Sequence, residues 1–147
     1  MAQKILVLNG PNLNLLGLRE PHVYGGLDYD GLIRLIEARA RELGVEAVIR
    51  QSNHEGELVD LIQKGAAAYA GIVINPGAYT HTSVAIRDAL LAVSLPTVEV
   101  HISNTAKREP FRHHSYIADV VVGTITGLGP KGYLYALETL ADLTGAQ

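Results

Sequence analysis

The chain has 147 residues, of which 48% are hydrophobic, and a formal net charge of −3. This length suits one domain with a buried core, spanning residues 1–147, and the negative charge argues against general nucleic-acid binding. The absence of cysteine excludes thiolate catalysis, cysteine-based zinc sites and a disulfide scaffold.

Apolar runs of strand length alternate with helical patterns along the whole chain, which predicts a parallel α/β sheet. The pattern predicts strands over residues 4–9, 45–51, 71–75, 97–102 and 117–123. Helices are expected over 28–43, after a capping box in Ser52-Asn53-His54-Glu55, from Thr82 or Ser83, and over 130–143. Five strands with helices on both faces predict a flavodoxin-like doubly wound five-stranded parallel sheet, which is a three-layer sandwich.

No apolar run approaches the roughly 20 residues that a membrane helix needs. The first residues lack the pattern of a signal peptide. We therefore expect a soluble cytoplasmic protein with no membrane partner and no nucleic-acid partner.

Polar loops follow three of the predicted strands, where doubly wound sheets bind their ligands. They are Asn9-Gly10-Pro11-Asn12-Leu13-Asn14, the segment from Asn75 to Ser83, and His101-Ile102-Ser103-Asn104. Asn, Gly, Pro and Ser are also the common turn formers, so turn chemistry explains each loop alone equally well. Three such loops at one edge of the sheet favour a binding site.

Glu99 and His101 lie two residues apart near the end of an apolar strand, so they point to the same face. Burying either group is costly unless it is hydrogen-bonded, and a carboxylate beside an imidazole holds the ring in one tautomer. His101 is therefore the first acid/base candidate, and Glu99 is expected to orient its ring and to favour its protonated form.

The loop over residues 16–26 has glycines near both ends and carries Arg19 and Tyr24, so it resembles a lid. A phenol is a poor base at neutral pH, and making it one takes roughly 4 kcal/mol of stabilisation of the phenolate. A nearby guanidinium such as that of Arg19 supplies part of this. The alternative is an ordinary surface loop.

Three charged residues, Arg108, Arg112 and Asp88, each allow two interpretations. Arg108 and Arg112, four residues apart, would share one side of a helical turn beside His101 and could hold an anion or hydroxyl groups. The alternative is a solvated charged turn, which we adopt for Lys107 and His113 in the same segment. Asp88 points away from the apolar stripe of its helix, which makes it either a plain exposed acid or a group that completes a neighbouring subunit's site.

Other kinds of site fit less well. Residues 127–132 match a dinucleotide-binding glycine pattern, but they follow the last predicted strand, so we interpret them as a turn and helix start. His81, Glu99 and His101 lack a ligand spacing typical of metal sites, and we expect no metal.

Flavodoxin-like sheets also serve as flavin carriers and signalling receivers. A receiver needs an acidic pair where this chain has Asn9 and Asn12. A flavin carrier needs backbone N–H groups in this loop to bind the flavin phosphate, and Pro11 has no N–H.

The motifs taken together resemble the type II 3-dehydroquinate dehydratases over nearly the whole chain. The resemblance rests on Asn9-Gly10-Pro11-Asn12-Leu13-Asn14, Arg19-Glu20-Pro21 with Tyr24-Gly25, Asn75-Pro76-Gly77-Ala78-Tyr79-Thr80-His81-Thr82-Ser83, Glu99-Val100-His101-Ile102-Ser103-Asn104, and Arg108 with Phe111-Arg112 and His114-Ser115. It implies a single catalytic domain that removes water from 3-dehydroquinate by trans-elimination through an enolate, without a cofactor. The product is 3-dehydroshikimate, in the shikimate pathway of aromatic amino-acid biosynthesis or in quinate catabolism.

The same resemblance assigns roles to residues. Tyr24 is implied as the base, Arg19 as the group that stabilises it, Asn12 as the holder of a water on the enolate oxygen, and His101 as the acid for the departing hydroxyl. The substrate-binding residues implied are Asn75, His81, Ile102, Ser103 and Arg112, with Asp88 from an adjacent subunit and with Glu99 and Arg108 in support. The family's assembly implies a homo-oligomer, a dodecamer built from trimers.

Overall fold

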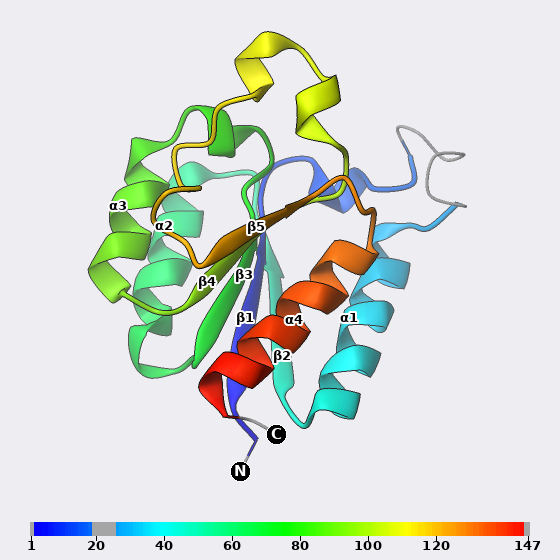
Figure 1. Ribbon diagram of the computed structural model, residues 1–147, viewed down its shortest axis with the longest axis vertical. Helices are drawn as coiled ribbons and strands as arrows, with labels where there is room; N and C mark the ends of the chain where they lie inside the picture. The colour runs from blue at the N-terminus through cyan, green and yellow to red at the C-terminus, as the bar shows by residue number, and fades with distance from the viewer. Residues whose placement is uncertain (1, 19–25, 146–147) are drawn as a thin grey trace.

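Five parallel strands form one sheet in the order β2-β1-β3-β4-β5, in a computed structural model that describes residues 2–18 and 26–145. The strands are β1 (Lys4–Asn9), β2 (Glu46–Gln51), β3 (Gly71–Asn75), β4 (Thr97–His101) and β5 (Gly123–Thr126). The helices are α1 (Tyr29–Leu43), α2 (Glu55–Lys64), α3 (Val84–Val93) and α4 (Lys131–Thr144). Figure 1 shows α1 and α4 on one face of the sheet and α2 and α3 on the other. This confirms the predicted flavodoxin-like architecture.

The alternation of side chains along β1 explains why both faces are covered. Ile5 and Val7 pack into the cluster under α1 and α4, whereas Leu6 and Leu8 pack into the cluster under α2 and α3. All four are at most 1% exposed, and burying such a side chain contributes about 1.5–3 kcal/mol. A strand buried on both faces needs the continuous apolar run that the sequence shows.

Helix ends follow the capping residues closely. The Asp28 carboxylate accepts a hydrogen bond from the Gly31 N–H at 2.8 Å, and the Ser83 hydroxyl accepts one from the Ile86 N–H at 2.9 Å. Each side chain satisfies an N–H that the first turn leaves unpaired. The predicted ends of helices 28–43 and 130–143 and of strands 45–51 and 97–102 are right within one residue.

The predicted capping box at residues 52–55 is wrong. His54 occupies the N-cap position of α2 and makes no side-chain cap. The Ser52 N–H still donates to the Asn9 carbonyl, so Ser52 continues the line of β2 and its hydroxyl accepts from the His54 N–H at 2.9 Å. α2 therefore begins at Glu55, later than a cap at Ser52 would place it.

The predicted strand over 117–123 is also wrong, because β5 begins only at Gly123. Ile117 is 1% exposed and packs with the cluster under α2 and α3, joined there by Val120 and Val121. A turn closed by the Val120 N–H and the Ile117 carbonyl links them. These apolar residues cover the sheet rather than extend it, which periodicity alone does not distinguish.

In the part of the chain that the structure describes, five 3₁₀ turns connect the elements: η1 (Leu13–Leu15), η2 (Gly65–Ala67), η3 (Gly77–His81), η4 (Thr105–Lys107) and η5 (Pro110–Arg112). The loops that follow β1, β3 and β4 gather at the same end of the sheet, in the upper part of Figure 1. The chain direction across the sheet reverses between β1 and β3, which is where this fold class binds ligands. Within the described residues, no helix is both long enough and apolar enough to cross a membrane.

Candidate active site

A cavity of about 360 Å³ opens at the carboxyl ends of β1, β3 and β4. Its lining comes from the loops after these three strands. The residues are Pro11, Asn12, Leu13, Leu15, Leu16, Gly17, Asn75, Gly77, Ala78, His81, His101, Ile102, Ser103, Thr105, Arg108 and Arg112. The three polar loops singled out in the sequence therefore meet around one hollow.

The loop after β1 is fixed from two sides. Asn12 has a left-handed backbone with φ of 70°, which asparagine tolerates better than most residues, and its N–H donates to Asn53 Oδ1 at 3.0 Å. Gln51 Nε2 donates to the Gly10 carbonyl at 3.1 Å. A Cβ at Gly10 would lie 2.2 Å from the Pro76 carbonyl oxygen, so this close approach to the loop after β3 requires glycine.

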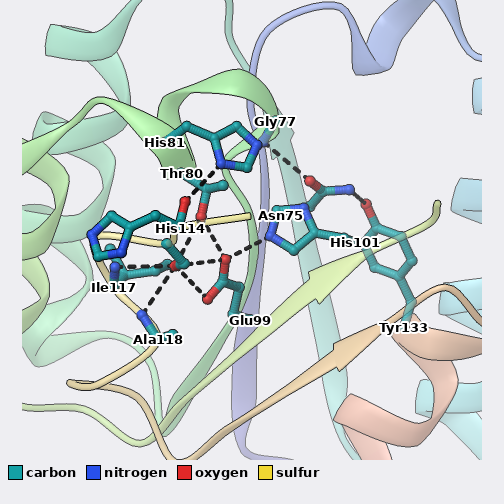
Figure 2. Close-up of polar contacts among 11 residues, drawn as sticks. Asn75, Gly77, Thr80, His81, Glu99, His101, His114, Ile117, Ala118 and Tyr133 are labelled. Atoms are coloured by element: carbon teal, nitrogen blue, oxygen red, sulfur yellow. Dashed lines mark hydrogen bonds and ion pairs between the residues drawn. The ribbon is translucent and has the colours of Figure 1, made fainter. Parts of the chain in front are cut away.

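Asn75 ends β3 with its side-chain amide held at both atoms. Oδ1 accepts from the Gly77 N–H at 3.1 Å, and Nδ2 donates to the Tyr133 hydroxyl at 2.9 Å (Figure 2). The amide is thus fixed in one orientation, with one N–H and one lone pair left for a ligand. It lies 3% exposed at the floor of the cavity.

Tyr133 extends this arrangement toward α1. Its hydroxyl donates to Asn9 Oδ1 at 2.7 Å, and Asn9 Nδ2 donates to the Tyr29 hydroxyl at 3.2 Å. Burial strongly raises the pKa of Tyr133, so the phenol remains protonated and able to donate. A hydrogen-bonded chain of four polar side chains, Tyr29, Asn9, Tyr133 and Asn75, therefore runs from the start of α1 to the cavity.

Glu99 is 1% exposed and accepts hydrogen bonds from three side chains. Thr80 Oγ1 donates to Oε2 at 2.5 Å, and Ser115 Oγ lies 2.9 Å from Oε1 and 3.0 Å from Oε2. His101 Nε2 lies 2.6 Å from Oε2. Burial acts to raise the pKa of Glu99, but the hydrogen bonds from His101, Thr80 and Ser115 outweigh it and the pKa is lowered. Glu99 is a buried carboxylate.

The contact with Glu99 fixes the tautomer of His101. A carboxylate only accepts hydrogen bonds, so Nε2 carries the proton in this contact. Among the described residues Nδ1 has no hydrogen-bond partner, and His101 lines the cavity. Nδ1 is therefore the ring nitrogen available to a ligand, and it can donate a proton when the ring is an imidazolium.

A second imidazole lies beside the first. His81 Nδ1 lies 2.8 Å from the His114 carbonyl oxygen, which only accepts, so Nδ1 is protonated (Figure 2). The rings of His81 and His101 are stacked with centroids 6.4 Å apart and an angle of 18° between their planes. In the neutral ring Nε2 of His81 is an acceptor, which suits the hydroxyl group of a ligand.

Arg108 and Arg112 both line the cavity, but the expected shared helical turn is wrong. Pro110 starts a second 3₁₀ turn, and Arg108 has an extended backbone between η4 and η5. Glu109 holds the two side chains together: its Oε1 lies 3.5 Å from Arg108 Nε and 3.1 Å from Arg112 Nε. Arg108 Nη1 also reaches Ser103 Oγ at 3.4 Å.

The glycine pattern at residues 127–132 shapes the loop after β4. The Gly127 N–H donates to the His101 carbonyl at 3.1 Å, and the Gly129 N–H donates to the Ile102 carbonyl at 3.0 Å. Gly127 has a φ of 87°, and a Cβ there would lie 2.9 Å from the Asn104 side chain. These residues form the predicted turn and helix start, and they position Ile102 and Ser103 at the cavity.

Glu99 contacts His101 but is not itself part of the cavity lining. Arg19 and Tyr24 lie outside the described residues. Asp88 is exposed on α3 and does not belong to the cavity lining. Within residues 2–18 and 26–145 no group of three or more His, Asp or Glu side chains is arranged to hold a metal ion.

Sequence reasoning missed three side chains that support the site: Thr80, Ser115 and Tyr133. Thr80 and Ser115 lie inside motifs quoted above, but their shared contact with Glu99 depends on the fold that brings β4 between them. Tyr133 lies in the helix predicted over 130–143, and nothing in a helical pattern indicates that its hydroxyl meets two asparagines 58 and 124 residues away.

Replacing Glu99 by glutamine should lower the free energy of unfolding by about 1–3 kcal/mol at neutral pH, because the amide cannot accept from all three donors. The lowered pKa sets the sign of the pH dependence. The carboxylate's stabilisation is complete above the unfolded value of 4.5 and is lost as pH falls through the lower folded value. The difference in Tm between wild type and Glu99→Gln should therefore shrink on acidification below about pH 4.5.

Thermal unfolding followed by circular dichroism checks this prediction. Glu57→Gln at an exposed position of α2 is the matched control and should leave Tm nearly unchanged. A difference for Glu99→Gln that stays constant from neutral to acid pH would contradict an ionised Glu99.

Comparison with known proteins reveals close relatives. The sequence model of the family described as Dehydroquinase class II matches residues 3–141. The chain is 58% identical over 140 residues to a 3-dehydroquinate dehydratase of Halothermothrix orenii, covering 95% of each protein. It is 55% identical over 141 residues to a catabolic 3-dehydroquinase of Aspergillus clavatus, covering 96% of this chain and 94% of the relative. A crystal structure of type II dehydroquinase from Butyrivibrio crossotus superposes with a TM-score of 0.91 at 50% identity, covering 95% of this chain and 97% of that one.

Proposed function

This chain belongs to the class II dehydroquinase family, and we propose on that basis that it dehydrates 3-dehydroquinate to 3-dehydroshikimate without a cofactor. We propose that the reaction serves the shikimate pathway or quinate catabolism. Some relatives are named catabolic 3-dehydroquinase, and others are named 3-dehydroquinate dehydratase. The single observation that carries the proposal is His101 held by buried Glu99 at 2.6 Å, with its other ring nitrogen available in a polar cavity.

The proposed reaction has two steps. Tyr24, ionised with help from Arg19, removes a proton from the carbon next to the ketone, and the electron pair moves onto the ketone oxygen as an enolate. Asn12 helps to hold a water that donates to this oxygen. The enolate then re-forms the carbonyl and expels the hydroxyl group, which takes its proton from His101 Nδ1 and leaves as water.

Two sets of groups suit a small anion that carries hydroxyls. Arg112 and the backbone N–H groups of Ile102 and Ser103 suit its carboxylate, and Arg108 is in reach of Ser103 at 3.4 Å. Asn75 and His81 suit its hydroxyls, because Asn75 keeps one N–H and one lone pair, and His81 keeps Nε2, after their fixed contacts are counted. Glu99 holds the His101 ring through Nε2, which leaves Nδ1 for the departing hydroxyl.

A direct assay tests the proposed activity. Adding 3-dehydroquinate to the purified chain should produce the ultraviolet absorbance of an enone at a rate proportional to protein concentration. The rate should not change after treatment with a metal chelator, since no step uses a metal ion. No absorbance rise anywhere between about pH 6 and about pH 9 would refute the activity.

We further propose that the chain acts as a homo-oligomer, a dodecamer built from trimers, and that it is one catalytic domain in the cytoplasm. The outward face of α3 supports a subunit contact. Val84 and Leu91 on this face are 51% and 53% exposed, and Asp88 lies between them on the same stripe. In this arrangement Asp88 completes the site of an adjacent subunit.

A further inference from the structure

Two hydroxyl groups, those of Thr80 and Ser115, lie against Glu99 and are not among the described groups that line the cavity. Thr80 Oγ1 lies 2.5 Å from Glu99 Oε2, and Ser115 Oγ lies 2.9 Å from Oε1 and 3.0 Å from Oε2. Figure 2 shows Thr80, Glu99 and His101 side by side. An effect of either hydroxyl on the reaction therefore has to pass through Glu99 and His101.

The Ser115 hydroxyl can only donate to Glu99. Its oxygen accepts from the Ile117 N–H at 3.2 Å and from the Ala118 N–H at 3.0 Å, so both of its lone pairs are used. Its single proton is left for the carboxylate. Thr80 Oγ1 lies 3.2 Å from Ser115 Oγ, but Ser115 has no lone pair left to accept from it. The Thr80 proton therefore also goes to Glu99.

Three consecutive residues fix the segment after η5 against the loop after β3. The His114 carbonyl accepts from His81 Nδ1 at 2.8 Å, and the Tyr116 N–H donates to the Thr80 carbonyl at 2.8 Å. Ser115 lies between these two contacts in the chain. The backbone pairing therefore brings the hydroxyls of Thr80 and Ser115 to the same carboxylate.

The proton between Glu99 and His101 can in principle move either way. As an imidazolium, His101 carries one proton on Nε2, facing Glu99, and one on Nδ1, available to the leaving group. If Glu99 took the Nε2 proton, the ring would be a neutral imidazole, which is a far weaker acid. Burial works to raise the pKa of Glu99, whereas the hydrogen bonds from His101 and from the two hydroxyls lower it. The hydroxyls thus oppose transfer of the proton to Glu99.

We propose that Thr80 and Ser115 are positioning residues for the acid step. Their hydroxyls keep Glu99 ionised and oriented, so the Nε2 proton stays on the His101 ring and the Nδ1 proton goes to the departing hydroxyl. The inference rests on the proposed dehydration and deepens it. It concerns the second step alone, because the enolate forms before His101 acts.

Thr80→Val tests this role, because valine keeps the shape of threonine and removes the hydroxyl. One hydrogen bond to a carboxylate is lost, so kcat for 3-dehydroquinate should fall roughly tenfold while KM changes little. Exchange of the substrate proton next to the ketone with deuterium should stay at the wild-type rate. Thr80→Ser keeps the hydroxyl and should keep kcat near wild type. Enone absorbance and mass spectrometry measure the two rates.

Two comparisons separate a positioning role from a loss of packing. Thr97 of β4 is also buried, at 3% exposed, but its hydroxyl donates to the Leu95 carbonyl at 2.9 Å. Thr97→Val should lower Tm and leave both rates unchanged. In the His101→Ala background, Thr80→Val should cause no further loss of kcat, because the group through which it acts is gone.

Exchange and dehydration that fall by the same factor in Thr80→Val would overturn the inference, as would a further loss of kcat in the double variant. If circular dichroism shows that Thr80→Val is unfolded, Ser115→Ala is measured in its place and should give the same split between the two rates. A wild-type chain that forms no enone would instead refute the proposed dehydration, and this inference with it.

Discussion

His101→Ala should lower kcat by about a thousandfold while KM changes little, because the variant loses the acid that protonates the departing hydroxyl. The structure supports this role through the geometry of the ring. Nε2 is hydrogen-bonded to Glu99 at 2.6 Å, whereas Nδ1 has no partner among the described residues. His101 lines the cavity, so Nδ1 is available to the substrate. Steady-state kinetics by enone absorbance measures the loss.

A second measurement separates the two steps. The proposed enolate forms before His101 acts, so His101→Ala should still exchange the substrate proton next to the ketone with deuterium from solvent. Mass spectrometry of recovered 3-dehydroquinate detects this exchange. His54→Ala, an exposed histidine before α2, is the matched control and should keep wild-type kcat. If His101→Ala kept kcat within about tenfold of wild type, another group would have to be the acid.

Tyr24→Phe should lower kcat by about a thousandfold or more and should also abolish the deuterium exchange. Phenylalanine keeps the ring but cannot accept the substrate proton, so neither step begins. Tyr24 lies outside the described residues, and the expectation rests on the sequence motif and on the need for a base opposite the His101 acid. Substrate binding should survive, which isothermal titration calorimetry with the inactive variant can measure.

Tyr135→Phe serves as the control for this experiment, because Tyr135 is 46% exposed on α4 and does not line the cavity. It should turn over at the wild-type rate. A Tyr24→Phe protein that retained proton exchange but lost dehydration would move Tyr24 from the first step to the second.

Much of the fold was predictable because local patterns and tertiary packing agree. β1 and β3 are apolar runs buried on both faces, and the sequence predicts their bounds correctly. Asp28 and Ser83 cap helices in the way that short polar side chains do. The errors fall at residues 52–55 and 117–122, where a local pattern fits two structures and long-range packing chooses between them.

The candidate site was predictable for a similar reason and only in part. Parallel strands deliver their carboxyl ends to one edge, so the three polar loops had to meet. The pairing of Glu99 with His101 followed from alternation within one strand. The contacts from Thr80 and Ser115 were not predictable, since they join segments separated by 19 and 16 residues from Glu99 through the packing of irregular loops.

The chain of side chains from Tyr29 to Asn75 has a consequence for when the site becomes complete. Every described residue that lines the cavity is found at or before Arg112 in the sequence, whereas the hydroxyl that orients Asn75 comes from Tyr133 in α4. During synthesis on the ribosome all of the cavity residues emerge before this hydroxyl does. The cavity residues therefore leave the ribosome before Gly127 and Gly129 can position Ile102 and Ser103, and before α4 can dock on the sheet and fix the Asn75 amide.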